Sequence, residues 1–275
     1  MNRIILFLLL LASTAVAQKA APVGIELYSF RKQFAEDMSG TMAKVRQMGF
    51  REVEVAGIGN LDAPELRKLL DKNSLKAISL GASFEDLDSN VPKVLAQAKA
   101  LGAKYVVCFW IPHSGDMFTI YDADRAVDVL NTAGSLLAQN GVSLCYHPHG
   151  YEFQTYKDGT FMDYLAENLD PKSINFEMDV YWVKSPGYSP VALLQKYPKR
   201  FPLMHLKDRK PGTPDSMTGH DDVENNVTLG QGDVGIADVM KQAKKSGVKH
   251  YFIEDESSRA MQQVPESIVF LNGLR

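Results

Sequence analysis

The sequence predicts a single α/β domain, a (β/α)8 or TIM barrel. Short β-branched or aromatic runs alternate with longer amphipathic stretches after residue 17, which is typical of βα units on a parallel sheet. We count eight such units, and residues 18–275 have about the length of one barrel of this class. The expected strands are Val23–Tyr28, Glu52–Ala56, Leu75–Leu80, Tyr105–Trp110, Val142–His147, Ile174–Asp179, Pro202–Leu206 and His250–Glu254.

Glycines support this division into units. Each of four glycines lies between a helical stretch and the next strand, where a helix end commonly needs a residue at positive φ: Gly49, Gly102, Gly141 and Gly247. The longest interval, residues 209–233, contains two prolines and follows the seventh strand. An interval of this length is more often a lid or substrate loop than a spacer.

Residues 1–17 have the pattern of a cleaved secretory signal peptide. Arg3 precedes an apolar run over residues 4–11, and Ala15-Val16-Ala17 closes the segment. No later run reaches the roughly 20 apolar residues of a transmembrane helix. We therefore expect an exported protein, periplasmic or secreted, without a membrane span.

The charge and the cysteine content limit which binding partners and which cysteine chemistry we expect. The net charge is −3, and the longest basic run is Lys244-Lys245, so nucleic acid is not an expected partner. Cys108 and Cys145 lie in strand-like runs, and we expect them to be buried thiols. The oligomeric state stays open, a homo-oligomer included.

Three of the expected strands end in residues that bind metals. Asp179 ends the sixth strand, His205 lies in the seventh and Glu254 closes the eighth. A parallel barrel brings the C-terminal ends of its strands around one cavity, so these side chains are expected to converge there. Carboxylate and imidazole ligands together suit a divalent metal ion.

The fifth strand supplies further candidates. His147 and His149 have the same strand parity, and Glu152 follows within one loop. We interpret His147 and Glu152 as catalytic candidates and His149 as the fourth metal ligand, with Glu152 as the alternative ligand. Lys207 is two residues beyond His205 and, with Glu254, completes the catalytic set.

Three charged residues lie inside expected strands, where a charge is costly unless it is paired or used. Glu26 and Glu54 are expected to form a polar layer that holds the metal ligands in place, and Glu177 is expected to lie deeper than Asp179.

Aromatic residues close to these positions suggest a sugar-binding surface. Trp110 and Trp182 fall at strand ends, next to His113 and Asp179. Flat amphipathic rings suit the apolar face of a sugar, so we assign Trp110, His113 and Trp182 to substrate binding. Core packing beneath a loop is the alternative for both tryptophans.

With these motifs in order, the chain resembles the xylose isomerase-like TIM barrel family of sugar phosphate isomerases and epimerases. The matching segments, which span most of the chain, are Gly24–Arg31, Gly49–Glu54, Tyr146–His149 with Glu152, Met178–Trp182, His205–Asp208, Gly230–Gly232 and Ile253–Asp255. The resemblance implies one divalent ion (Mn2+, Co2+, Mg2+ or Zn2+) on a strand-5 group, Asp179, His205 and Glu254. Epimerase members carry a Glu at the strand-5 position, where this chain has His147, His149 and Glu152.

The resemblance implies a small carbohydrate substrate. The main expectation is isomerisation or epimerisation of a non-phosphorylated keto sugar, by removal of an α-proton and stabilisation of an enediolate by the metal. The alternative is a lyase that cleaves 3-keto-glycosides by β-elimination, functionally coupled to an oxidoreductase that oxidises the sugar. A third hypothesis is an exported sugar-binding barrel without catalysis. Phosphodiester cleavage, found in related barrels, is disfavoured by the acidic charge.

Overall fold

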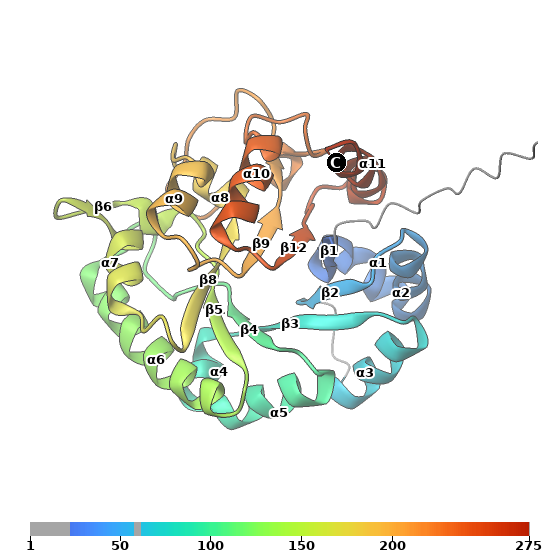
Figure 1. Cartoon of the computed structure of the whole chain (residues 1–275), viewed down its shortest axis with the longest axis horizontal. Coiled ribbons are helices and arrows are strands. Elements are labelled where there is room, and N and C mark those ends of the chain that lie inside the picture. Colours follow the sequence, from blue (N-terminus) through green and yellow to red (C-terminus); the bar gives the residue numbers. More distant parts are fainter. Residues whose placement is uncertain (1–22, 58–61, 275) are drawn as a thin grey trace, which may run out of the picture.

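The computed structural model describes residues 23–57 and 62–274, so the predicted signal peptide lies outside the described residues. Eight parallel strands close a barrel in the order β1-β12-β9-β8-β5-β4-β3-β2, and helices surround it (Figure 1). The barrel strands are β1 (Val23–Glu26), β2 (Glu52–Val55), β3 (Lys76–Ala82), β4 (Tyr105–Cys108), β5 (Ser143–Tyr146), β8 (Ile174–Asp179), β9 (Leu203–Leu206) and β12 (His250–Ile253). The predicted class and all eight predicted strands are confirmed.

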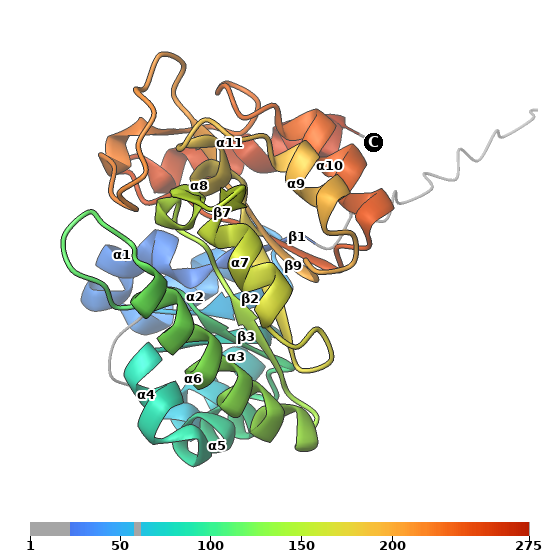
Figure 2. The same ribbon diagram turned by 90° about the vertical axis from the view of Figure 1, so that its left-hand side faces the viewer.

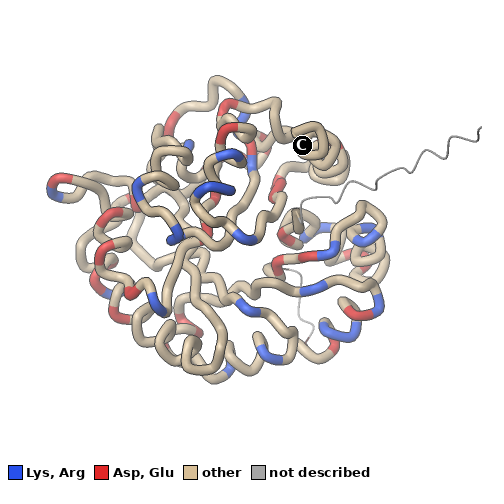
Figure 3. Tube along the Cα trace, in the orientation of Figure 1, with Lys and Arg blue, Asp and Glu red and all other residues tan. Residues whose placement is uncertain are grey.

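The outer layer consists of helices whose apolar faces pack on the barrel. The four glycines predicted to end helices all have positive φ, and Gly102 and Gly247 are the C-cap residues of α5 and α10. Basic and acidic residues are both scattered over this layer (Figure 3). The helices are α1 (Arg31–Glu36), α2 (Met38–Gln47), α3 (Ala63–Lys72), α4 (Phe84–Ser89), α5 (Val91–Leu101), α6 (Ile120–Gln139), α7 (Phe161–Asn168), α8 (Val180–Lys184), α9 (Pro190–Lys196), α10 (Ile236–Ser246) and α11 (Ala260–Gly273).

Two small hairpins extend the loops beyond the strand ends: β6 (Thr155–Tyr156) with β7 (Gly159–Thr160), and β10 (Asp208–Arg209) with β11 (Asn226–Val227). The second hairpin begins the long interval after β9. At the base of this interval, the Asp208 carboxylate accepts hydrogen bonds from the backbone N–H groups of Gly230, Gly232 and Val234.

The long loop after β9 lies beside the loop before α6, and both appear on the left of Figure 2. The Gln154 amide donates to the carbonyl oxygens of Asp116, at 2.8 Å, and Met217, at 3.2 Å. One side chain therefore joins both loops at the C-terminal end of the barrel.

The barrel interior changes character along its axis. Val107, Cys145, Leu203 and Phe252 form a small apolar cluster inside the barrel. Two residues further along three of these strands, the inward positions are polar: His147, His205 and Glu254. The apolar cluster therefore forms the floor of a polar chamber at the C-terminal strand ends. Both cysteines are buried free thiols, as expected.

Among residues 23–57 and 62–274, no helix combines the length and apolar character needed to span a bilayer.

Candidate metal centre and active site

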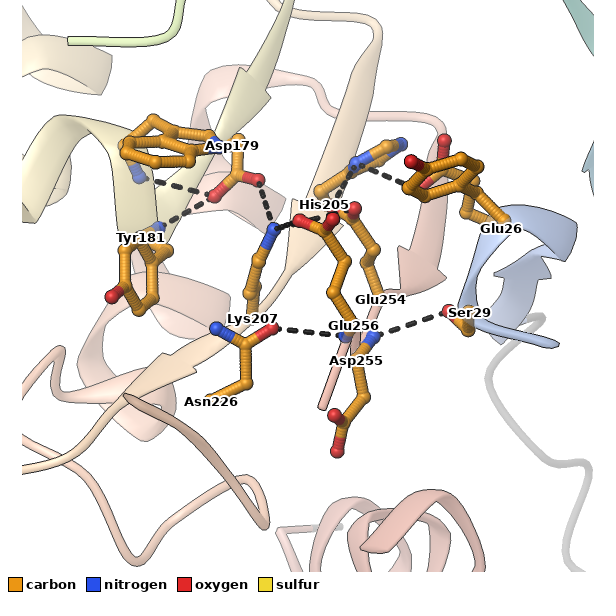
Figure 4. A network of polar contacts seen from close by, with 12 residues as sticks. Glu26, Ser29, Asp179, Tyr181, His205, Lys207, Asn226, Glu254, Asp255 and Glu256 are labelled. Atoms are coloured by element: carbon orange, nitrogen blue, oxygen red, sulfur yellow. Dashed lines mark hydrogen bonds and ion pairs between the residues drawn. The ribbon is translucent and has the colours of Figure 1, made fainter. Parts of the chain in front are cut away.

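The predicted trio of Asp179, His205 and Glu254 meets in the polar chamber (Figure 4). Asp179 on β8 lies opposite His205 on β9 in the strand register, and all three side chains are buried. The Nδ1 atom of His205 is 3.0 Å from Oε2 of Glu254. Parallel strands thus bring together side chains that are far apart in the sequence.

Three more carboxylates surround His205. Its Nε2 atom is 2.7 Å from Oε1 of Glu54 and 3.3 Å from Oε2 of Glu177, while its Nδ1 atom is 3.7 Å from Oε2 of Glu26. Burial lowers the pKa of His205, but Glu177, Glu26 and Glu54 together hold that pKa well above its usual value. Glu26, Glu54 and Glu177 occupy the polar layer expected from the sequence.

The two histidines after β5 lie at different depths. Nε2 of His147 is 3.7 Å from Oδ2 of Asp179, and His147, Asp179 and His205 offer ligand atoms within 4.8 Å of one another. The His149 ring lies further out, with its centroid 5.5 Å from the Trp110 ring and 5.5 Å from the Trp182 ring. The structure thus brings His147, rather than His149, to the other candidate ligands.

Both imidazoles after β5 are neutral. Burial lowers the pKa of His147 well below its usual value and, with the nearby Lys207 ammonium, lowers the pKa of His149 to about 3. Nδ1 of His149 is 3.2 Å from the carbonyl oxygen of His147. A carbonyl only accepts hydrogen bonds, so Nδ1 carries the proton of His149 and its Nε2 is an unprotonated acceptor.

Glu152 lies on the other side of the barrel wall from the chamber. It is fully buried, and it accepts hydrogen bonds from the Tyr146 hydroxyl and from the N–H groups of His149, at 3.1 Å, and Gly150, at 2.9 Å. Burial raises the pKa of Glu152 to about 7 against the lowering effect of these donors. The structure thus places Glu152 against the backbone of His149 and does not bring its carboxylate to Asp179, His205 or Glu254.

Lys207 is a buried cation at the edge of the chamber. Its Nζ atom is 3.3 Å from Oε1 of Glu254 and 4.0 Å from Oδ2 of Asp179, and it also contacts the Glu256 carboxylate. Burial lowers the pKa of Lys207, but these carboxylates hold it well above its usual value, so the amine is protonated.

Two neighbours of Lys207 were not among the predicted site residues. These are Glu256 and Tyr181, whose ring centroid is 5.6 Å from Nζ. The shared parity of Glu256 and Glu254 was the available signal.

The chamber fits a divalent cation. Among the described residues, seven buried side-chain polar atoms lack a hydrogen-bond partner, and five of them gather here: Glu26 Oε2, Glu54 Oε2, His147 Nε2, Glu177 Oε1 and Asp179 Oδ2. An unpaired buried polar group costs about 1–3 kcal/mol. Burial and Glu254 also raise the pKa of Asp179 to about 7, although Lys207 and His205 oppose this shift. A cation on His147, Asp179, His205 and Glu254 would pair the free atoms of His147 and Asp179, and its positive charge would favour the ionised form of Asp179.

A cavity of about 300 Å³ opens beside the chamber. Its lining includes Glu26, Tyr28, Phe109, His147, His149, Glu254 and Glu256, with no Lys or Arg among its described lining residues. This volume is at the small end of ligand pockets.

The three predicted sugar-binding residues lie at the outer rim. Trp110 and Trp182 lie beside His149, and His113 stacks on Trp110 with ring centroids 5.0 Å apart. His220, from the long loop, lies against the same Trp110 ring, with ring centroids 5.3 Å apart, and this contact was not predicted.

A parallel barrel with an acidic, histidine-containing chamber at its C-terminal strand ends has the architecture of a TIM-barrel enzyme. The xylose isomerase-like TIM barrel family profile matches residues 42–273, so the chain belongs to that family. The family resemblance seen in the sequence is confirmed.

Curated proteins and solved structures both include relatives that are similar to this chain. An inosose dehydratase of Geobacillus kaustophilus (strain HTA426) is 27% identical over 189 residues, which are 61% of this chain and 60% of that protein. The match thus covers about 60% of the length of that curated relative.

Among solved structures, a sugar phosphate isomerase/epimerase from Parabacteroides distasonis ATCC 8503 has a TM-score of 0.74 at 21% identity, covering 93% of this chain and 97% of that chain. The IolI protein with a binding zinc atom has a TM-score of 0.69 at 14% identity, covering 92% and 96%. At these identities the two structures show the shared fold alone.

Proposed function

We propose that this protein is a metal-dependent lyase that acts on a non-phosphorylated keto sugar. It would remove the proton on the carbon next to the ketone and expel a group from the following carbon. The observation that carries the proposal is that a proton acceptor and a fixed positive charge lie at the same chamber. The ring centroid of the neutral His149 imidazole lies 5.5 Å from the centroid of the Trp182 ring. The Nζ atom of the protonated Lys207 lies 5.5 Å from the same ring.

Four residues would hold the ion: His147, Asp179, His205 and Glu254. A divalent ion bound there polarises a ketone and stabilises the negative charge that forms when the α-proton leaves. This arrangement exchanges the roles expected for the two histidines after β5. It makes His147 the ligand and leaves His149 free to act on the substrate.

His149 is the proposed base. Its Nε2 atom is unprotonated because Nδ1–H is used by the His147 carbonyl, and its ring lines the cavity. His149 would take the α-proton, the electron pair of that bond would form a C=C bond, and the leaving group would depart with the electrons of its C–O bond. The protonated His149 can then give the proton to the departing oxygen, so the step is redox-neutral and releases an alcohol or water.

Lys207 is the proposed electrostatic partner. Glu254, Glu256 and Asp179 keep it protonated, so it cannot act as the base. A fixed ammonium can instead stabilise the oxygen on which negative charge develops.

Two lines of support favour a lyase on an uncharged sugar. Similar curated proteins are named inosose dehydratases, and a dehydratase removes water by elimination. In the cavity, Glu254 and Glu256 would repel a phosphate group. Because elimination does not create the ketone, a separate oxidoreductase would have to oxidise the sugar before this protein acts on it.

Isomerisation or epimerisation, the main expectation from the sequence, begins with the same proton removal and remains the second candidate. A two-carboxylate epimerisation would need a strand-5 Glu inside the chamber. Glu152 is the available carboxylate, and it lies outside the barrel wall against Tyr146. This placement favours elimination.

The test is incubation of the metal-loaded protein in D2O with a 3-keto-glucoside and with free keto sugars. We expect aglycone release by the wild type and a rate about 100 to 10,000-fold lower in His149→Asn, with metal content unchanged. His250→Asn, which changes a histidine at the N-terminal end of β12, is the control. Deuterium uptake without release would assign isomerase or epimerase chemistry instead, and binding with neither would leave a sugar-binding barrel.

A further inference from the structure

A second cavity, of about 280 Å³, lies at the C-terminal ends of β2, β3 and β4. It adjoins the cavity of about 300 Å³ beside the chamber, which we call the reaction cavity. The two cavities share the lining residues Ala56, Gly57 and Phe109. The Phe109 ring, whose centroid is 5.3 Å from that of His147, lies between the second cavity and the chamber. A ligand in the reaction cavity can therefore extend past Phe109 into the second cavity.

Small residues keep the second cavity open. Ala56, Gly57, Gly81 and Ala82 line it, so four wall positions carry at most a methyl group. A Cβ atom added at Gly81 would come within 2.6 Å of the Phe109 ring, and one added at Gly57 within 2.2 Å of the Tyr28 ring. A side chain at Gly57 or Gly81 would therefore displace a ring that shapes both cavities.

The two cavities differ in chemistry. In the second cavity, Phe84, Phe109, Trp110 and Pro112 present apolar surface. Among its described lining residues, the polar groups are the side chains of Ser83 and Glu85 and the indole N–H of Trp110. The Ser83 hydroxyl already accepts the N–H of Asp86 as the N-cap of α4. The reaction cavity, in contrast, is lined by three Glu and two His residues.

We propose that the second cavity is a subsite for an uncharged, apolar, planar group attached to the reacting sugar ring. The substrate is then an aryl glycoside rather than a free monosaccharide. This inference takes the identity of the reacting ring from the proposed function, whereas binding in the subsite does not require turnover.

The experiment measures calorimetric binding of phenyl and methyl glucosides, which lack the ketone and do not react. Burying an aryl ring is expected to make the phenyl glucoside bind about 10 to 100-fold more tightly. Ala82→Leu, which fills the subsite, should abolish this preference and leave methyl glucoside affinity unchanged. Ala35→Leu, on an exposed face of α1, is the matched control.

Ala82→Val, which fills less of the subsite, provides a second variant if Ala82→Leu lowers the melting temperature. Equal binding of the two glucosides by the wild type would overturn the subsite, as would a preference that survives both variants or a disaccharide that binds as tightly as the phenyl glucoside. The outcome is separable from the proposed function. Aryl preference without exchange of the keto sugar in D2O contradicts the lyase alone, and exchange without aryl preference contradicts the subsite alone.

Discussion

Near the end of β5, buried acids lie on opposite sides of the barrel wall: an inner group around His205 and an outer group in which Glu152 is the acid. On the inner side, Asp179 and its neighbours include five polar atoms without a hydrogen-bond partner. On the outer side, both Glu152 oxygens accept hydrogen bonds from Tyr146 or from the backbone N–H groups of His149 and Gly150. The two groups are equally buried, but only the inner one is incomplete.

This difference separates two uses of a buried carboxylate. An acid with all its acceptors filled holds a loop in place, and it contributes to stability. An acid left with an unfilled oxygen among like charges costs free energy until a cation arrives. Glu152 and Asp179 are equally buried, so burial does not distinguish them. They differ in whether every carboxylate oxygen accepts a hydrogen bond.

The largest expected effect is on turnover. Asp179→Asn should lower the rate about 1,000-fold or more, because the ion and its several kcal/mol of transition-state stabilisation are lost. Glu152→Gln, the matched amide substitution on the outer side, should keep the rate within about tenfold. Steady-state kinetics with metal analysis of both variants checks this contrast. Similar losses in both would show that the wall does not separate the two functions.

Removal of the metal tests the incomplete inner group directly. With the ion at 100 times its Kd, binding stabilises the fold by about 2.7 kcal/mol, so chelation should lower Tm by about 5–10 °C. The wild type and Glu152→Gln should both show this shift, and Asp179→Asn should not. A chelator-independent Tm in the wild type would contradict a cation in the chamber.

The polar layer of Glu26, Glu54 and Glu177 should raise the metal affinity of the site without binding the ion directly. Glu54 bonds to His205, so Glu54→Gln is expected to weaken metal affinity about 10 to 100-fold. Glu52→Gln, on the same strand but paired with His250 away from the chamber, is the control and should leave affinity unchanged. Competition with a chromophoric chelator measures both. Equal affinities in the two variants would remove Glu54 from the site.

The smallest effect belongs to the outer group and appears in stability. Glu152→Gln should lower the free energy of unfolding by about 1–3 kcal/mol, because an amide cannot accept from all the donors that the carboxylate serves. Tyr146→Phe should cost about 1 kcal/mol, and the double variant should cost less than the sum. Urea unfolding of the three variants measures this coupling. Strict additivity would mean that the two side chains act independently.

Strand periodicity was sufficient to predict the barrel, its eight strands and the convergence of Asp179, His205 and Glu254. Parity along a parallel strand fixes which side chains face the axis, and the sequence contains that information. The position of Glu152 was not predictable in this way. It depends on the backbone turn at Gly150, where φ is 102°, and on the outward Tyr146 hydroxyl that receives the acid. The relative depth of His147 and His149 depends equally on how the chain leaves β5.

The barrel closes where its first strand, β1, pairs with its last, β12, with Ile25 opposite Ile253. Glu26 and Glu254, one residue further along each strand, meet at this seam and share His205 as a neighbour. Contacts between such distant parts of the chain are slow to form during folding. The chamber is therefore completed only when the ring closes. Binding of the ion, in contrast, needs only the neighbouring strands β5, β8, β9 and β12, which carry the four proposed ligands, and closure of the seam adds Glu26 beside them.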